Sequence, residues 1–340
     1  MKKQIVFILL SLIGVIAYIS YLLILPCSNF SEKSSTFIIE EGKTDKEDVI
    51  NTLEQNKIIK NVWAFSLVAN QLNIWRKLKP GKYEIKQNDN ILTVVKMLRK
   101  NKQVEAKLII NKIRTREDLA RLIGKNFSTD SISVVRFLSS NDSLAPFSVD
   151  TNTVMNLIIP NTYTFYWGTS VYKILLKLQT VNEQFWNKND RLQKANALGF
   201  SPKDVYTIAS IVEEETNMNE DKGKIASVYI NRFHQGMNLG ADPTVKFALK
   251  NFLIKRVLFN QLKVESPFNT YMHKGLPPGA ICTPSISTID AVLNAPTTNY
   301  LYFVAKSDFS GYSNFSSNFT QHSIYAKQYQ QALDNYHIQK

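Results

Sequence analysis

In residues 204–216, DVYTIASIVEEET, apolar residues at helical spacing are followed directly by three consecutive glutamates. At about 100° per residue, the valines and isoleucines of this stretch share one face of a helix. Glu214 then projects from the opposite side into solvent, Glu213 lies on the flank, and Glu215 falls back on the apolar side. A carboxylate on a burying face is costly unless it is protonated, paired or used, and burial raises its pKa toward the range that a general acid requires. The pattern alone leaves open a helix whose polar end carries three solvated glutamates.

Short motifs follow this helix in a fixed order along the rest of the chain. They are VYINR at 228–232, GMNL at 236–239, DPTV at 242–245, SPFNTY at 266–271, GLPPGAI at 275–281 and YLYFVA at 300–305. In this order and spacing the set resembles the membrane-bound endolytic murein (peptidoglycan) transglycosylases, the MltG or YceG-like family. The resemblance is dense from about 201 to 329.

The resemblance implies a catalytic residue. The family's catalytic glutamate immediately precedes threonine in Glu-x-Glu-Thr, which here is Glu215, the residue that the helical pattern also singles out. Glu213 matches the other family glutamate and is expected to support the chemistry, although a structural ion pair is an open alternative. Glu214 is expected to be dispensable.

Further residues of the motifs are candidates for contacts with a sugar. Asn269 and Tyr271 alternate in what looks like an extended run, so their side chains can share one face toward the substrate. For the residues of the Asp-Pro-Thr motif, a role in capping a turn remains open. The candidates in the motifs are Asp242, Thr244, Asn269 and Tyr271. A further segment that resembles the family adds Asn318, with His322 as a weaker candidate.

The amino terminus predicts a membrane anchor. Residues 5–25 carry no charge and follow two lysines; about 20 apolar residues span a bilayer, and leading lysines favour a cytoplasmic amino terminus. A cleaved signal peptide usually has a shorter apolar region and ends in small residues. We therefore expect residues 1–4 in the cytoplasm, a transmembrane helix at 5–25, a linker at 26–36 and a catalytic domain on the outer side of the cytoplasmic membrane.

Composition restricts the cofactors and partners. The net charge is +13 and the chain has two cysteines and four histidines, without the spacing of a zinc, redox or H-E-x-x-H site. We expect no metal and no cofactor. The chain has no basic-aromatic recognition motif, so we expect no nucleic acid partner. The charge instead predicts attraction to anionic lipid and wall polymers. The resemblance implies peptidoglycan glycan strands, the cytoplasmic membrane and penicillin-binding protein synthases as partners.

The remaining chain divides into two parts of an expected α+β protein. Residues 37–103 resemble a LysM-like βααβ module, which is a glycan-binding unit or, alternatively, a packing adapter. Residues 104–340 form a mixed α/β catalytic domain with its core at 155–335. Strands are expected at 37–40, in 79–85 and at 107–110, and helices at 46–55, 61–72, from 88 or 90 to 100, 115–123 and 170–189.

The predicted function is an endolytic lytic transglycosylase that cuts nascent strands between N-acetylmuramic acid and N-acetylglucosamine. It leaves 1,6-anhydro ends and so terminates strand elongation. Two alternatives remain: an inactive glycan-binding scaffold, or a glycoside hydrolase that uses Glu213 and Glu215 together. Two glutamates two positions apart on a helix point about 200° apart, which is a poor arrangement for bracketing one bond. The preference for peptide-bearing or bare glycan stays open.

Overall fold

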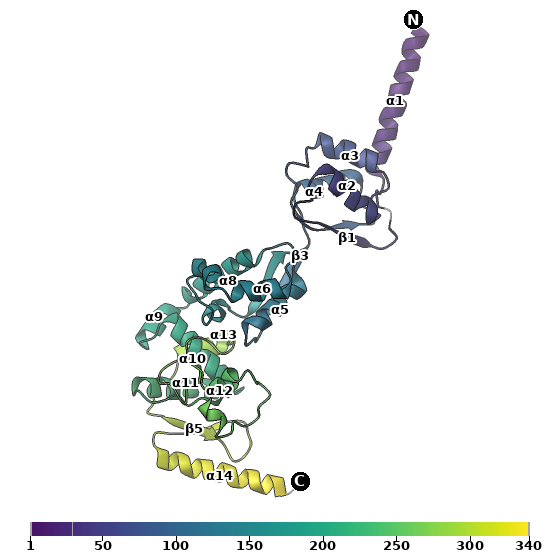
Figure 1. The fold of residues 1–340 in the computed structure, drawn as a ribbon. Helices are drawn as coiled ribbons and strands as arrows, with labels where there is room; N and C mark the ends of the chain where they lie inside the picture. The colour runs from purple at the N-terminus through teal and green to yellow at the C-terminus, as the bar shows by residue number, and fades with distance from the viewer. Residues whose placement is uncertain (1, 29, 339–340) are drawn as a thin grey trace. The chain divides into compact units, whose positions relative to one another are not determined.

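The computed structural model describes residues 2–28 and 30–338 of the chain, which contain many helices and a few short strands (Figure 1). Two compact units result, one made of residues 1–107, 126–128 and 164–169, and the other of 108–125, 129–163 and 170–340. The strands form three two-stranded sheets in the described part of the chain. A mixed α and β fold is therefore confirmed.

The first unit contains a small antiparallel sheet covered by three helices. Its elements are β1 (Ser34–Ile39), α2 (Lys46–Gln55), α3 (Val62–Gln71), β2 (Gly81–Lys86) and α4 (Ile91–Arg99). β1 pairs with β2 in a register that sets Phe37 opposite Tyr83, and their rings stack at 5.7 Å. Alternate residues of both strands face the helices and are buried, as the period of two requires.

Caps explain where the helices of this unit begin. Asn61 and Asn90 accept hydrogen bonds from the backbone amides three residues on, as expected for N-caps. Asp45 accepts the corresponding bond at the start of α2. The β-α-α-β order is present, whereas the resemblance to LysM stays a prediction.

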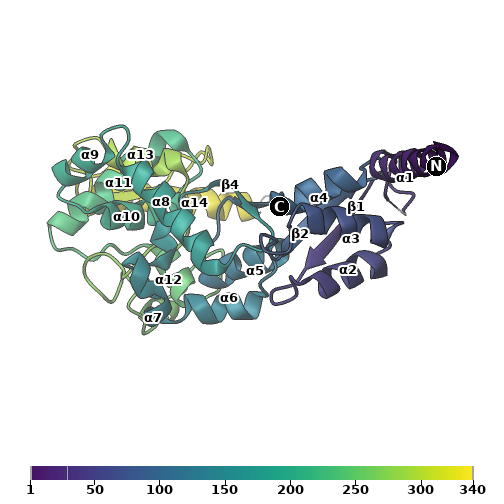
Figure 2. The same ribbon diagram turned by 90° about the horizontal axis from the view of Figure 1, so that it is seen from above.

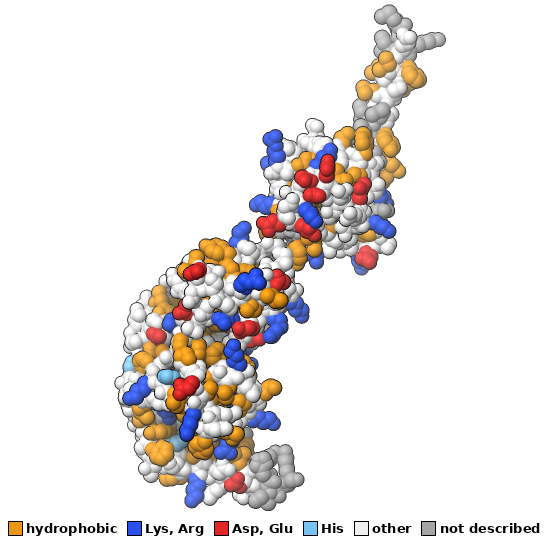
Figure 3. Space-filling view, viewed as in Figure 1, with side chains coloured by type: hydrophobic (Ala, Val, Ile, Leu, Met, Phe, Trp, Pro, Cys, Tyr) orange, Lys and Arg blue, Asp and Glu red, His pale blue; other side chains and the backbone are white. Residues whose placement is uncertain are grey.

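The chain begins with α1 (Lys2–Ile24), which exposes apolar side chains such as Val6, Phe7 and Ile8 (Figure 3). Among the residues that the structure describes, no helix combines the length and the apolar character needed to cross a membrane. The span predicted over 5–25 thus stays a prediction without structural support.

The second unit is mainly helical. β3 (Glu105–Ile110) pairs with β4 (Asn161–Tyr166), and the division between the units passes through both strands. Its first helices and 3₁₀ turns are α5 (Arg116–Asn126), α6 (Ser131–Leu138), α7 (Asn141–Leu144), η1 (Ala145–Phe147), η2 (Val154–Leu157), α8 (Val171–Trp186) and α9 (Arg191–Ala197). The remaining elements are α10 (Pro202–Glu215), α11 (Asn219–His234), α12 (Asp242–Ala248), η3 (Gln261–Lys263), α13 (Ile286–Leu293), β5 (Tyr302–Ala305), β6 (Ser313–Ser316) and α14 (Phe319–Ile338).

α10 is the central helix of this unit. Ser201 and Asp204 form a reciprocal capping box and Pro202 occupies the first turn, so the start of the helix is strongly specified. Figures 1 and 2 place α10 beside α11 and α13, with which it shares the main hydrophobic core. All residues from 205 to 212 are buried. The single apolar stripe expected here is therefore wrong, because neighbours cover the helix on every side.

Candidate active site

Glu214, at the carboxyl end of α10, is held by two cations. Arg114 donates two hydrogen bonds to its carboxylate, at 3.1 and 3.0 Å, and Lys112 Nζ lies 3.0 Å from Oε1. The side chain is only 17% exposed. Burial alone would raise the pKa of Glu214, but the hydrogen bonds and charges of Arg114 and Lys112 lower it overall. The prediction that Glu214 projects into solvent is wrong, because a segment about 100 residues earlier folds over it.

Glu213 joins α10 to the two helices beside it. Ser285 donates to Glu213 Oε2 at 3.0 Å, and the Thr288 hydroxyl donates to the same oxygen. Lys222 of α11, whose side chain is 8% exposed, lies 3.5 Å from that oxygen. These contacts favour the structural ion pair that the sequence left open. The supporting role of Glu213 in catalysis stays a prediction.

Glu215 has different surroundings from either neighbour. The Tyr229 hydroxyl, from α11, donates to Glu215 Oε1 at 2.6 Å. Burial raises the pKa of Glu215 to about 7, against the lowering effect of the Tyr229 hydrogen bond. The charge of Asp242 raises this pKa further, while Lys246 and Arg232 oppose it. Of the three glutamates, this one is suited to carry a proton at neutral pH and to give it up.

Asp242 and Tyr271 form a second hydrogen-bonded pair near Glu215. The Tyr271 hydroxyl donates to Asp242 Oδ1 at 2.6 Å, and both side chains are half-buried. Burial and the adjacent Asp242 raise the pKa of Tyr271, to which the charge of Glu215 also contributes. Two of the predicted candidates therefore lie within electrostatic reach of the predicted catalytic residue.

Arg232 is fixed beside this pair by the backbone. Its guanidinium donates to the carbonyl oxygens of Leu301 and Leu239, at 2.7 and 2.6 Å. Gly240 has a φ of 59°, and a β-carbon there would lie 3.4 Å from Arg232 Nη1. The turn thus favours glycine and keeps the arginine close to Tyr271. We call the six residues of this region the Glu215 cluster: Glu215, Tyr229, Arg232, Asp242, Lys246 and Tyr271.

The sequence analysis gave no role to three members of the Glu215 cluster. Tyr229 and Arg232 lie three residues apart in VYINR, so they occupy neighbouring positions on one side of α11. Their presence in the VYINR motif is the signal that could have identified them. Lys246 lies four residues after Asp242 on α12, and no local pattern distinguishes it.

Thr244 and Asn269 are buried parts of the scaffold. The Thr244 hydroxyl donates to the Ala241 carbonyl at 2.6 Å and lies 2.9 Å from the Thr270 hydroxyl. Asn269, 0% exposed, donates from its amide nitrogen to the carbonyls of Leu262 and Val264, both at 2.9 Å, and accepts from the Tyr271 amide at 3.0 Å. The extended run expected at 269–271 is wrong: the segment is a turn, so Asn269 and Tyr271 do not share a face.

Asn318 and His322 belong to the start of α14. Asn318 is exposed and accepts a hydrogen bond from the Gln321 amide at 2.9 Å, as a cap does. His322 stacks on Tyr302 with ring centroids 5.2 Å apart. Asn318 thus takes the capping role that the sequence left open, and within the described part of the chain no hydrogen bond or ion pair joins its side chain to the Glu215 cluster.

Replacing Asn269 by alanine should destabilise the second unit. The change leaves the carbonyl oxygens of two half-buried residues, Leu262 and Val264, without this donor, which costs up to about 1–3 kcal/mol for each group. Differential scanning calorimetry should show a lower Tm for Asn269→Ala, and glycan turnover measured well below that Tm should stay near that of the parent protein. Asn299→Ala, at an exposed position that caps no helix, is the matched control. A normal Tm with lost turnover would instead place Asn269 in direct contact with substrate.

No group of three or more histidine, cysteine, aspartate or glutamate side chains that could hold a metal ion occurs among the described residues. Both cysteines, Cys27 and Cys282, are buried and unbridged.

Known families and solved structures include proteins that are similar to this chain. A family model described as the YceG-like family matches residues 37–328. A crystal structure of a yceG-like protein from Listeria monocytogenes is 30% identical, with a TM-score of 0.55, over 86% of this chain and 99% of that one.

Two curated relatives carry the name endolytic murein transglycosylase. The protein of Bacillus subtilis (strain 168) is 40% identical over 125 residues, which are 37% of this chain and 34% of the relative. That of Streptococcus pneumoniae serotype 2 (strain D39) is 26% identical over 313 residues, 83% of this chain and 56% of the relative. The chain thus spans between one third and just over half of the length of these relatives.

Proposed function

The chain belongs to the YceG-like family, whose model covers residues 37–328, and from this premise we propose that it is an endolytic lytic transglycosylase of peptidoglycan. The observation that carries the proposal is Glu215, a single carboxyl group with a pKa raised to about 7 beside a hydroxyl donor. The curated relatives, named endolytic murein transglycosylases, support the same activity.

The proposed reaction uses Glu215 twice. Protonated Glu215 first gives its proton to the oxygen that links N-acetylmuramic acid to N-acetylglucosamine, and the bond to the anomeric carbon breaks. The resulting carboxylate then takes the proton of the muramyl 6-hydroxyl, whose oxygen bonds to the anomeric carbon and closes the 1,6-anhydro ring. No water is consumed, and Glu215 ends protonated.

The neighbours of Glu215 fit both halves of this cycle. Tyr229 donates to Oε1, so proton transfer falls to Oε2. The same hydrogen bond stabilises the carboxylate formed midway, because a donor to an anion favours the charged form. Asp242 raises the pKa of Glu215 and adds negative charge where positive charge develops on the sugar. The carboxyl group is therefore an acid before bond cleavage and a base after it.

The hydrolase alternative is less well supported. Its proposed partner Glu213 is bound by Ser285, Thr288 and Lys222, and these contacts use one oxygen of its carboxylate for packing α10 against its neighbours. A hydrolase also needs a second carboxylate that brackets the same bond as Glu215. The transglycosylase mechanism requires only one carboxyl group, which Glu215 provides, and the other carboxylate of the cluster, Asp242, accepts the Tyr271 hydroxyl.

Mass spectrometry of the products tests the proposed function. Purified peptidoglycan incubated with the full chain in detergent should yield new 1,6-anhydromuramyl ends. Carrying out the digestion in ¹⁸O-labelled water should leave these ends unlabelled, since no water attacks. Labelled reducing ends would contradict the proposal and indicate a hydrolase, with Asp242 as the second carboxylate to examine.

We further propose that residues 5–25 anchor the chain in the cytoplasmic membrane, with the second unit outside and close to nascent strands and penicillin-binding synthases. The support is the uncharged stretch of sequence behind Lys2 and Lys3. The full chain should stay with the membrane fraction after alkaline carbonate extraction, and external protease should digest it in spheroplasts. Release into the supernatant would refute the anchor. Deleting residues 2–25 provides the control.

A further inference from the structure

A charged pocket lies in the second unit, apart from the residues assigned to catalysis. It has a volume of about 150 Å³, comparable to engineered cavities of ~150 Å³ that take up one benzene molecule. Its rim carries Arg114, Arg116, Glu117 and Lys250, and its floor carries the rings of Phe247 and Phe268. We propose that this pocket binds the peptide stem of a peptidoglycan strand, so that the enzyme prefers peptide-bearing glycan; this inference rests on the proposed function.

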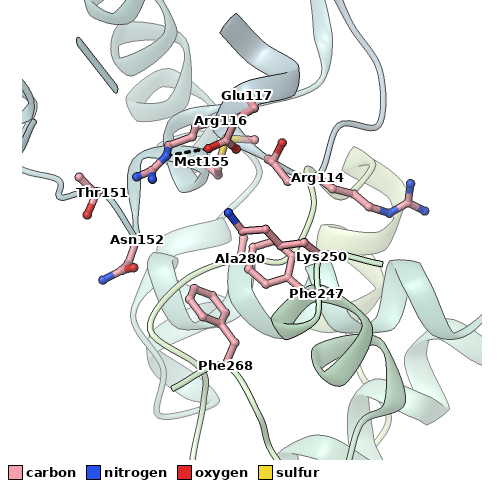
Figure 4. A pocket seen from close by; sticks show the side chains of 11 residues that line it. Arg114, Arg116, Glu117, Thr151, Asn152, Met155, Phe247, Lys250, Phe268 and Ala280 are labelled. Carbon is pink, nitrogen blue, oxygen red and sulfur yellow. Dashed lines mark hydrogen bonds and ion pairs between the residues drawn. The ribbon is translucent and has the colours of Figure 1, made fainter. Parts of the chain in front are cut away.

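The rim has one cation that is available for a ligand. Arg114 is bound by Glu214, and Arg116 lies 3.2 Å from Glu117. Lys250 is exposed and has no ion pair among those found in the described chain. Figure 4 shows its amine extended across the pocket, above the two phenylalanine rings. A carboxylate entering the pocket would therefore meet Lys250 first.

The floor suits small apolar groups. The rings of Phe247 and Phe268 lie 4.8 Å apart at 46°, and Met155 and Ala280 complete the apolar lining. Thr115, Thr151 and Asn152 add hydrogen-bonding groups at the edge. Such a mixture of apolar surface and a few polar groups is typical of sites for small ligands.

The charges of the substrate decide which part of it fits here. The sugar rings of a peptide-bearing strand are uncharged, because the muramyl carboxyl is consumed in the amide bond to the peptide. All formal charges of the strand then reside in the stem, which has carboxylates, alanine methyl groups and, when it is not cross-linked, the free amine of its diamino acid. Lys250 can bind a carboxylate of the stem and the phenylalanine rings can cover a methyl group, whereas Glu117 is already paired with Arg116.

The pocket and the Glu215 cluster are built on the same two segments. α12 places Asp242 and Lys246 near Glu215 and Phe247 in the pocket, and Lys250 lies just after the end of this helix. The turn that holds Tyr271 against Asp242 begins with Phe268. A smaller hollow of about 40 Å³ shares Arg114 with the pocket and Lys246 with the Glu215 cluster. A strand cut at Glu215 can thus place an adjoining stem in the pocket.

Comparing two substrates tests this inference. The full chain in detergent is given un-cross-linked peptidoglycan strands with stems, and the same strands after an amidase has removed the stems. Lys250→Glu should slow cleavage of the stem-bearing strands about tenfold, the effect of losing one charge-assisted contact, and leave cleavage of the bare strands unchanged. Lys173→Glu, an exposed lysine on α8, is the matched control and should behave as the parent protein on both. Equal slowing on both substrates, or no slowing on either, would overturn the inference.

A binding measurement separates this inference from the proposed function. Saturation-transfer NMR with the free pentapeptide L-Ala-γ-D-Glu-L-Lys-D-Ala-D-Ala should show contact with the parent protein and the Lys173→Glu variant, and a loss of contact with Lys250→Glu. If the parent chain cleaved neither substrate, the proposed function would fail while this measurement still decided the ligand of the pocket. Equal peptide signals from the parent and Lys250→Glu would overturn the pocket assignment whatever the activity.

Discussion

Glu215→Gln should reduce the formation of 1,6-anhydro ends by about 10²–10⁴-fold, the usual contribution of general acid–base catalysis. Glutamine keeps the shape of the side chain, and its oxygen can still accept the hydrogen bond from Tyr229. It carries no proton to give to the glycosidic oxygen and cannot accept one from the 6-hydroxyl. Both halves of the proposed cycle are lost, whereas binding of the strand should change little.

The measurement is the initial rate of anhydro-end release at saturating glycan, followed by mass spectrometry. Glu183→Gln, the same substitution at an exposed position of α8, is the matched control and should retain the full rate. Glu213→Gln should lower the Tm more than the rate at temperatures where the protein is folded. A Glu215→Gln protein that still released anhydro ends at the parental rate would remove Glu215 from its assigned role.

Local elements of the fold were predictable from the sequence because their signals are local. α2 is found at the expected 46–55, and Asn61 and Asn90 cap the following helices as expected. Caps and apolar periodicity act within a few residues, so a single sequence contains them. How much of α10 is buried depends on its packing against α11 and α13. No pattern within a few residues of α10 indicates that packing. The stripe expected on one face was therefore wrong.

The environment of the glutamates depends on contacts that are distant in sequence. Glu214 was expected in solvent, but its partner Arg114 lies 100 residues away, and nothing at either position indicates the pairing. Asn269 was misplaced for a related reason: alternation predicts a strand, whereas three hydrogen bonds to its own loop impose a turn. The sequence singled out Tyr271, which does belong to the Glu215 cluster. Its hydrogen bond to Asp242 could not be predicted, because the two residues are distant in sequence and meet only in the folded chain.

The raised pKa of Glu215 also implies a cost to stability that depends on pH. In the unfolded chain the carboxyl group should titrate near its ordinary value of 4.5, and in the folded protein its pKa is about 7. Between these values the folded state holds a proton that the unfolded state has lost, so the free energy of unfolding falls as pH rises. At about 1.4 kcal/mol per pH unit, the loss by this group amounts to up to about 3 kcal/mol above pH 7.

Glu215→Gln should therefore be more stable than the parent protein at pH 8 and equally stable at pH 4. Below pH 4.5 the side chain is neutral in both folded and unfolded parent protein, as glutamine always is. At pH 8 the parent must bury a carboxylate, and the variant does not. Calorimetry should give a Tm for the second unit that is higher in the variant at pH 8, by about 2–4 °C per kcal/mol in a unit of this size, and a difference that disappears toward pH 4. A variant less stable than the parent at pH 8 would show that the Glu215 carboxylate is stabilised by its neighbours, and the group would then lack the raised pKa that the acid role requires.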